Sequence, residues 1–255
     1  MLLMALGTAR AADVEPRGEH VVLLGDSNVW LGGDYCSRET GWSYWFREWT
    51  QPLSCRSFAR SGATWSHCAA TCADTMEVTE LISDNNVVYN QILRLLGCVE
   101  RHECEAPTLI IIMAGTNDAW FLKKRPGALQ ADAAEAFTAS EEELLQMDTP
   151  DLKSLAQAMR YDCTLLRRAF PEARILVTTP MQSIRVGIKY IRRAGDIIEG
   201  VAKLMDIKCL RLDRDIPIDC EHEKVRLRYT SDGTHTSPEG AQVVAEKVRA
   251  LTIEH

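Results

Sequence analysis

The chain has 255 residues, of which 46% are hydrophobic and 25% are charged, and its formal net charge is −7. This length is enough to bury one good-sized core, so a single domain is expected. The negative charge argues against a nucleic-acid-binding protein that neutralises phosphates, because such proteins carry a basic face. No apolar run is long enough to span a bilayer.

The first residues differ in composition from the rest of the chain. Residues 1–6 are mostly apolar, and Ala9-Arg10-Ala11 has the small-x-small form of a signal-peptide cleavage site, although a positively charged start is missing. We interpret residues 1–17 as a signal remnant or a disordered lead-in and expect one domain over residues 18–255. This motif and the cysteine content favour an extracytoplasmic location over a cytoplasmic one.

Nine cysteines are present, and an odd number cannot all pair within one chain. Cys68-x3-Cys72 and Cys98-x5-Cys104 lie in polar, loop-like sequence, where local disulfides can form in an oxidising compartment. The alternative for Cys68 and Cys72 is a zinc site with His67. Their spacing matches no zinc template and no second ligand pair follows, so we expect no metal. Cys209 lies in an apolar run and is predicted to be a buried thiol.

Strand-like and helix-like segments alternate along the chain. The segments predicted as strands are residues 21–24, 55–62, 108–115, 174–180 and 208–213. The segments predicted as helices are residues 42–49, 87–96, 131–147, 151–170, 184–205 and 238–251. Residues 63–85 are interpreted as a long irregular insert above the sheet edge, and residues 119–129 as a loop. Strands that alternate with helices favour a parallel sheet with helices on both faces.

Polar motifs recur where the predicted strands end. Gly25-Asp26-Ser27 follows the first strand, Gly62 ends the second, and Gly115-Thr116-Asn117-Asp118 follows the third. Asp232-Gly233-Thr234-His235 precedes the last helix. A lone Gly-Asp-Ser is more often a helix cap or a turn. In a parallel sheet, however, all strand ends meet at one edge, which is where open α/β sheets bind their ligands.

These four motifs, in this order, resemble the SGNH hydrolases, which are the GDSL esterase/lipase superfamily. The resemblance covers nearly the whole chain and implies a three-layer, flavodoxin-like α/β sandwich with a central, mainly parallel five-stranded sheet. The chain has no Gly-x-Ser-x-Gly elbow, which argues against the α/β-hydrolase fold.

The resemblance also implies a role for each block. Ser27 would be the nucleophile, His235 the base that takes its proton, and Asp232 the carboxylate that orients the imidazole. The backbone N–H groups of Ser27 and Gly62 and the side-chain amide of Asn117 would form the oxyanion hole. Asp26 and Asp118 are expected to be structural neighbours, with no proton transfer assigned to Asp26.

The function that follows is a serine esterase that hydrolyses carboxylic esters through an acyl-enzyme, with O-acetyl groups on carbohydrate as one substrate class. The alternatives are a lipase or thioesterase for longer acyl chains, and a binding module that keeps the fold without catalysis. Trp30, Trp65 and Trp120 each lie three residues beyond a block residue, so we expect them to line the substrate pocket. We expect no cofactor, and the sequence does not predict an oligomeric state.

Overall fold

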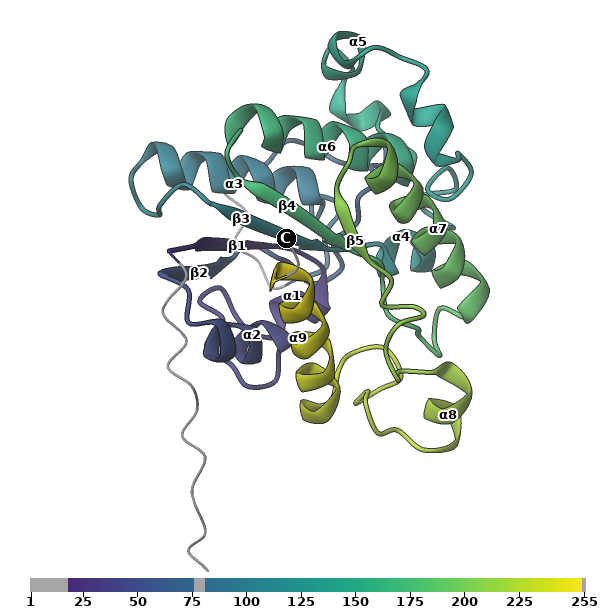
Figure 1. The fold of residues 1–255 in the computed structure, drawn as a ribbon. Helices are drawn as coiled ribbons and strands as arrows, with labels where there is room; N and C mark the ends of the chain where they lie inside the picture. Colours follow the sequence, from purple (N-terminus) through teal and green to yellow (C-terminus); the bar gives the residue numbers. More distant parts are fainter. Residues whose placement is uncertain (1–17, 76–80, 254–255) are drawn as a thin grey trace, which may run out of the picture.

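The computed structural model describes residues 18–75 and 81–253. Its centre is a parallel five-stranded sheet with the order β2-β1-β3-β4-β5 (Figure 1). The strands are β1 (His20–Gly25), β2 (Ser54–Ser57), β3 (Leu109–Met113), β4 (Arg174–Thr178) and β5 (Lys208–Leu210). The α/β architecture predicted from the alternating segments is therefore confirmed.

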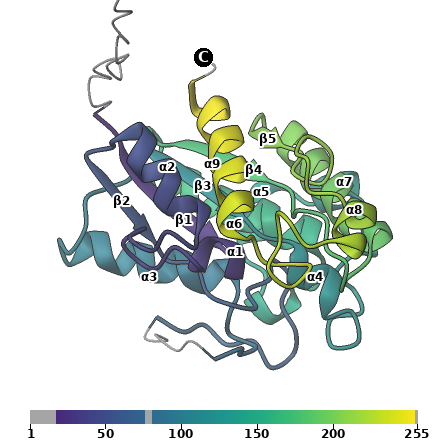
Figure 2. The ribbon, with the colours of Figure 1, turned by 90° about the horizontal axis from the view of Figure 1, so that it is seen from below.

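Helices cover both faces of this sheet (Figure 1). The α-helices are α1 (Ser27–Trp30), α2 (Trp42–Thr50), α3 (Val88–Glu100), α4 (Thr116–Trp120), α5 (Glu141–Leu145), α6 (Leu155–Ala169), α7 (Ile188–Leu204), α8 (Cys220–Val225) and α9 (Pro238–Ile253). Two short 3-10 helices, η1 (Ala133–Phe137) and η2 (Thr149–Asp151), lie between α4 and α6. Figure 2 shows α2 and α9 side by side on one face.

The alternation of side chains along β1 and β3 explains the two hydrophobic cores. Val21 and Leu23 face the core that contains α2 and α9, whereas Val22 and Leu24 face the core that contains α3, α6 and α7. All five residues of β3 are buried. A β-branched run of this kind is typical of a central parallel strand that is covered on both faces.

The strand order places the carboxyl ends of β1 and β3 next to each other. Gly25, the last residue of β1, pairs with Met113, the last residue of β3. In sheets of this order, the chain leaves these two strands towards opposite faces, and ligands bind at that switch point. Ser27 and Asn117 follow these two strands directly, so the topology brings them to one place.

The region between β3 and β4 differs from its sequence prediction. One helix was expected over residues 131–147, but η1 and α5 are separate, because Asp132 and Ser140 each begin a new helix with a capping box. The helix expected over residues 151–170 begins later as α6, after the cap Ser154, and Pro150 belongs to η2. The amino-acid composition of this region predicted helices, but it did not show that Asp132, Ser140 and Ser154 would each start a new one.

Two further differences concern element boundaries. The second strand was expected over residues 55–62, but β2 ends at Ser57 because the chain then turns towards the carboxyl edge of β1, where Phe58 donates a backbone hydrogen bond to Leu23 and Arg60 donates one to Gly25. The short helix α8 was not predicted; Asp219 caps it by accepting from the N–H groups of Glu221 and His222.

All nine cysteines are free thiols. Cys209 is partly exposed on the short edge strand β5, so the expectation of a buried thiol is too strong. The disulfides that the sequence allows between Cys68 and Cys72 and between Cys98 and Cys104 are absent from the described structure. None of the helices described here has the length and apolar character that a membrane crossing requires. The lead-in and signal-remnant interpretation concerns residues 1–17, which lie outside the described residues.

Candidate active site

A constrained turn follows β1. Gly25 has φ +146°, and a Cβ atom at this position would lie 2.1 Å from the carbonyl oxygen of Met113 on the neighbouring strand. Only glycine therefore fits. The buried amide of Gln91 on α3 accepts from the Gly25 N–H (2.7 Å) and donates to its carbonyl (2.8 Å). These two hydrogen bonds fix the backbone at Gly25, two residues before Ser27.

Ser27 is the first residue of α1. Asp26 caps this short helix, because its Oδ1 accepts from the N–H of Asn28 at 3.0 Å. The N–H of Ser27 has no preceding helical turn to bond to, which is the general condition of the first helical residues. The cap thus orients both the hydroxyl and the N–H of Ser27 at the carboxyl edge of the sheet.

Ser27, His235 and Asp232 form a continuous chain of hydrogen bonds. Ser27 Oγ lies 2.9 Å from His235 Nε2, and His235 Nδ1 lies 2.9 Å from Asp232 Oδ2. The second oxygen of Asp232 accepts from the backbone N–H groups of Thr234 (3.0 Å) and His235 (2.8 Å). With the imidazole proton on Nδ1, Nε2 is free to accept the Ser27 proton, which is the arrangement of an activated serine.

The environment keeps the Asp232 side chain charged. Burial alone would raise its pKa, but the hydrogen bonds from the backbone and the imidazole of His235 outweigh burial, so the pKa of Asp232 lies below its ordinary value. A carboxylate in this position favours the Nδ1–H tautomer and stabilises the imidazolium that forms when His235 takes a proton.

Two of the groups that the sequence predicts as oxyanion donors, the Gly62 N–H and the Asn117 side-chain amide, belong to segments that a hydrogen bond joins. The turn that contains Gly62 is closed by the N–H of Ala63, which donates to the carbonyl of Arg60 (3.2 Å) and leaves the Gly62 N–H outside that bond. Gly62 has φ +77°, a conformation that glycine adopts without strain. Asn117 Nδ2 donates one hydrogen to the carbonyl of Ala63 at 3.0 Å, which fixes the amide and leaves its second hydrogen available.

Comparison with known proteins places the chain in a family. A family model described as GDSL-like Lipase/Acylhydrolase matches residues 21–248. The chain belongs to the GDSL-like lipase/acylhydrolase family. Comparison with curated protein sequences gives no match.

Several solved structures share the fold. An acetyl xylan esterase, AlAXEase, matches with a TM-score of 0.57 at 16% identity, covering 92% of this chain and 100% of that one. A GDSL-like lipase from Bacteroides ovatus, described as putative, matches with a TM-score of 0.56 at 15% identity, covering 92% and 99% of the two chains. A similarly described protein from Bacteroides uniformis matches with a TM-score of 0.56 at 20% identity, covering 91% and 94%. At these identities the likeness shows the fold.

Asp118, the acidic residue of the Gly-x-Asn-Asp block, has a structural position in this chain. Asp118 accepts from the N–H groups of Trp65 (3.0 Å) and Ser66 (2.8 Å) and from the Ser66 hydroxyl (2.6 Å). It thereby anchors the long insert that follows Gly62. Burial raises the pKa of Asp118 although these hydrogen bonds oppose the change.

Asp26 is fully buried next to the nucleophile. Burial raises its pKa to about 6, against the opposing effects of the Asn28 N–H, the Thr116 side chain and the nearby His235. Its contact with the Asn28 N–H is the helix cap described above. The structure thus shows Asp26 as the cap of the helix that carries Ser27.

Asn28 is a site residue that the sequence did not single out. Its Oδ1 accepts from the N–H of Thr236 (3.2 Å), and its Nδ2 donates to the carbonyl of Thr234 (3.4 Å). Asn28 thus ties the helix that carries Ser27 to the loop that carries His235. Its position directly after Ser27 was the one sequence feature that pointed to a role in the site. The residues that it contacts could not be inferred from the sequence, because they lie more than 200 residues further along the chain.

The three tryptophans expected in the pocket occupy different environments. Trp65 is completely buried in the core with α3 and α6, so its indole does not line a pocket; the insert folds inwards at this residue. Trp120, at the end of α4, is 39% exposed. Trp30, at the end of α1, lines a cavity of about 290 Å³ together with Arg38, whose guanidinium lies over the indole.

Proposed function

We propose that the protein is a serine esterase that cleaves carboxylic esters through an acyl-enzyme on Ser27. The observation that carries this proposal is the hydrogen-bonded chain from Ser27 Oγ through His235 to Asp232, with 2.9 Å at each link. Membership of the GDSL-like lipase/acylhydrolase family supports hydrolysis as the reaction class.

The first half of the reaction forms the acyl-enzyme. Ser27 Oγ attacks the ester carbonyl carbon while its proton passes to His235 Nε2. The carbonyl oxygen gains negative charge within reach of the N–H groups of Ser27 and Gly62 and the amide of Asn117. One such donor contributes about 2.7–4 kcal/mol to transition-state stabilisation. The C–O bond then breaks, and His235 returns the proton to the departing alcohol.

The second half releases the acid. Water attacks the acyl carbon and gives a proton to His235, the same three donors hold the oxyanion, and the bond to Ser27 Oγ breaks as the proton returns to it. Asp232 remains ionised throughout and stabilises the imidazolium in both halves. Both halves of the reaction use only residues of this chain and water.

For the substrate we propose a short acyl group, with O-acetyl groups on carbohydrate as the preferred class. The exposed indole of Trp120 offers a face for a sugar ring. One neighbour of the same fold is described as an acetyl xylan esterase, which supports this choice by analogy. A lipase or thioesterase for longer chains is the alternative. We further propose that residues 18–255 form one domain. An extracytoplasmic location stays a prediction that rests on the motif Ala9-Arg10-Ala11.

Hydrolysis of p-nitrophenyl acetate, butyrate and octanoate by the wild type and by Ser27→Ala tests this proposal. We expect the highest kcat/KM on acetate and loss of turnover by about 10⁴-fold or more in the variant. Preference for octanoate would favour the lipase or thioesterase. Equal activity of the two proteins on every ester would reject Ser27 as nucleophile, and an inactive wild type would favour the binding module.

A further inference from the structure

Two cysteines that are 19 positions apart in the chain meet at the edge strand β2. The Sγ atoms of Cys36 and Cys55 lie 3.5 Å apart. Cys55 is the second residue of β2, and Cys36 lies in the loop between α2 and α1, the helix that begins with Ser27. The esterase reaction proposed above uses neither thiol.

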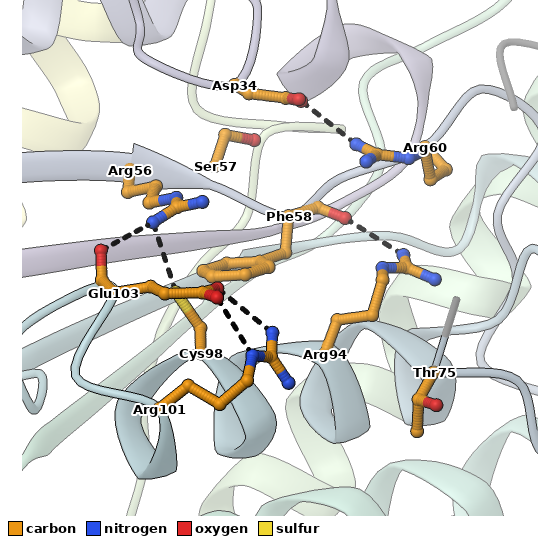
Figure 3. Close-up of a pocket in the computed structure, with 10 residues that line it drawn as sticks. All are labelled: Asp34, Arg56, Ser57, Phe58, Arg60, Thr75, Arg94, Cys98, Arg101 and Glu103. Atoms are coloured by element: carbon orange, nitrogen blue, oxygen red, sulfur yellow. Dashed lines mark hydrogen bonds and ion pairs between the residues drawn. The ribbon is translucent and has the colours of Figure 1, made fainter. Parts of the chain in front are cut away.

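Hydrogen bonds hold the loop with Cys36 against the strand with Cys55. The N–H of Ser57, on β2, donates to the carbonyl of Asp34 at 2.7 Å. The N–H of Cys36 donates to the carbonyl of Gly33 at 3.1 Å. The Asp34 carboxylate accepts from Arg60 at 2.9 Å, and Figure 3 shows this ion pair. Because these bonds fix both backbones, the two sulfurs are held close to each other.

The backbone of Cys36 has an unusual conformation. Its φ is +51°, which residues other than glycine, asparagine and aspartate seldom adopt. Such strained positions cluster where a side chain has a specific task. At Cys36 the strain is tolerated by a completely buried residue whose sulfur contacts a second sulfur.

The two thiols hold their protons unequally. The hydrogen bond that Cys55 donates lowers the pKa of Cys36 and raises that of Cys55. Burial opposes the change at Cys36, but the positive charge of Arg47 adds to it. Arg47 is held beside Cys36 because its guanidinium donates to the carbonyl of Tyr35 at 3.0 Å. Cys36 is therefore the sulfur that ionises first, and a thiolate is the form that attacks a disulfide.

Cys55 is the thiol that solvent reaches. It is partly exposed, whereas Cys36 is buried. Cys55 lines a cavity of about 430 Å³ together with Tyr35 and Arg47. A small disulfide such as oxidised glutathione therefore meets Cys55 first, and the Cys36 sulfur lies directly behind it.

We propose that Cys36 and Cys55 form a disulfide in an oxidising compartment, which links the loop after the Ser27 helix to the edge strand. The sulfurs must approach by about 1.5 Å to reach bonding distance, and rotation about the two Cα–Cβ bonds moves them while the backbone stays in place. Disulfides persist in oxidising compartments, which agrees with the extracytoplasmic location predicted from the sequence.

Thiol–disulfide exchange with oxidised glutathione balances the reaction. Cys55 Sγ loses its proton and attacks one glutathione sulfur, and the first glutathione leaves as a thiolate that takes up a proton. Cys36 Sγ, as the thiolate, then attacks Cys55 Sγ, and the second glutathione leaves in the same way. Two protein thiols are oxidised to one disulfide, and one oxidised glutathione is reduced to two thiols.

Peptide mapping of the full chain tests this proposal directly. The protein is incubated with oxidised or with reduced glutathione, its free thiols are blocked with iodoacetamide in denaturant, and it is digested without reduction. We expect a peptide that joins Cys36 to Cys55 after oxidation, and both cysteines blocked in the reduced protein. Two blocked cysteines after oxidation, or a bond from either one to a different cysteine, would overturn the proposal.

Thermal unfolding provides a second readout. A disulfide that closes a loop of this length is expected to raise the Tm of the oxidised wild type by about 6–12 °C over that of the reduced protein. Cys55→Ser is expected to lose this rise. The matched control Cys209→Ser, which removes a partly exposed thiol from the opposite edge strand, is expected to keep it.

The two cysteine variants decide the origin of the rise in Tm. An equal rise in Cys55→Ser and in the wild type would overturn the proposal, because it would come from another pair of thiols. Neither the mapping nor the unfolding uses a substrate. Both results therefore stand apart from the test of Ser27 as the nucleophile.

Discussion

Asp26 stands directly before the nucleophile and is neutralised more easily than an ordinary carboxyl. Burial raises its pKa to about 6, whereas the unfolded chain releases this proton near pH 3.9. Between these values the folded protein binds more protons than the unfolded chain does. The contribution of Asp26 to the free energy of unfolding is therefore present below about pH 4 and is lost as the pH rises through about 6.

Asp26→Asn cannot ionise, so it avoids the stability that the wild type loses when Asp26 becomes charged. The variant keeps the oxygen that accepts from the Asn28 N–H. We expect the variant to be more stable than the wild type at pH 8, by up to about 3 kcal/mol, and the difference to shrink as the pH falls towards 4. Urea unfolding at pH 4, 5, 6 and 8 measures it. A difference that is constant across this range would show that folding does not raise the pKa of Asp26.

Asn28 is expected to act as a positioning residue, because it joins the Ser27 helix to the His235 loop. Asn28→Ala breaks both bonds and leaves the Thr236 N–H without its partner. We expect kcat to fall by about 10-fold to 100-fold, since small displacements of the reacting groups are costly, with KM nearly unchanged. A loss confined to KM would place Asn28 in substrate binding instead.

The residues that we propose as catalytic were recognisable in the sequence, and the residues that hold them in place were not. Ser27 and Asn117 lie in short motifs directly after strands, Gly62 lies in a short motif after β2, and His235 lies in a motif before the last helix. Asn28 and Gln91 contact partners that are distant in the chain; Gln91, for example, bonds to a residue 66 positions earlier. No local sequence pattern identifies such residues, because asparagine and glutamine are equally common on solvent-exposed surfaces.

Among the elements, the turn that follows β2 carries Gly62, whose N–H is one of the proposed oxyanion donors. Gly62→Ala forces a side chain into φ +77° and brings its Cβ to 2.9 Å from Ile82. The backbone strain costs about 1–2 kcal/mol of stability. Because relief of this strain turns the peptide, we expect kcat on p-nitrophenyl acetate to fall by about 10²-fold, as for loss of one oxyanion donor.

Gly187→Ala is the matched control for this variant. Gly187 also has a positive φ, +91°, but it precedes α7 and a Cβ there meets nothing within 4 Å. We expect a similar loss of stability and unchanged kcat. Equal losses of kcat in the two variants would mean that the effect of Gly62→Ala comes from general destabilisation.

Helix boundaries were the least predictable elements. The run of alanine and glutamate over residues 131–147 reads as one helix, yet the side chains of Asp132 and Ser140 each bond to a backbone N–H and begin a separate short helix. In the same way, Ser154 begins α6 after Pro150. A local choice between continuing a helix and capping a new one depends on packing that the sequence pattern does not contain.

At the scale of the whole molecule, the parallel sheet and its two helical layers were predictable because β-branched runs alternate with amphipathic segments. The topology then brings Ser27, near the start of the chain, and His235, near its end, to one sheet edge. Trp65 shows the limit of this reasoning. Its spacing from Gly62 matched that of Trp30 from Ser27, but the insert anchored by Asp118 turns the indole into the core.

The proposed mechanism requires that Ser27 carries the acyl group during turnover. Mass spectrometry of the intact protein, quenched in acid during hydrolysis of p-nitrophenyl acetate and followed by peptide mapping, tests it most directly. We expect one acetyl group on the peptide that contains Ser27. We expect this group to be absent from Ser27→Ala and to accumulate only very slowly in His235→Ala. An acetyl group on any other residue, or turnover that persists in Ser27→Ala, would contradict this mechanism.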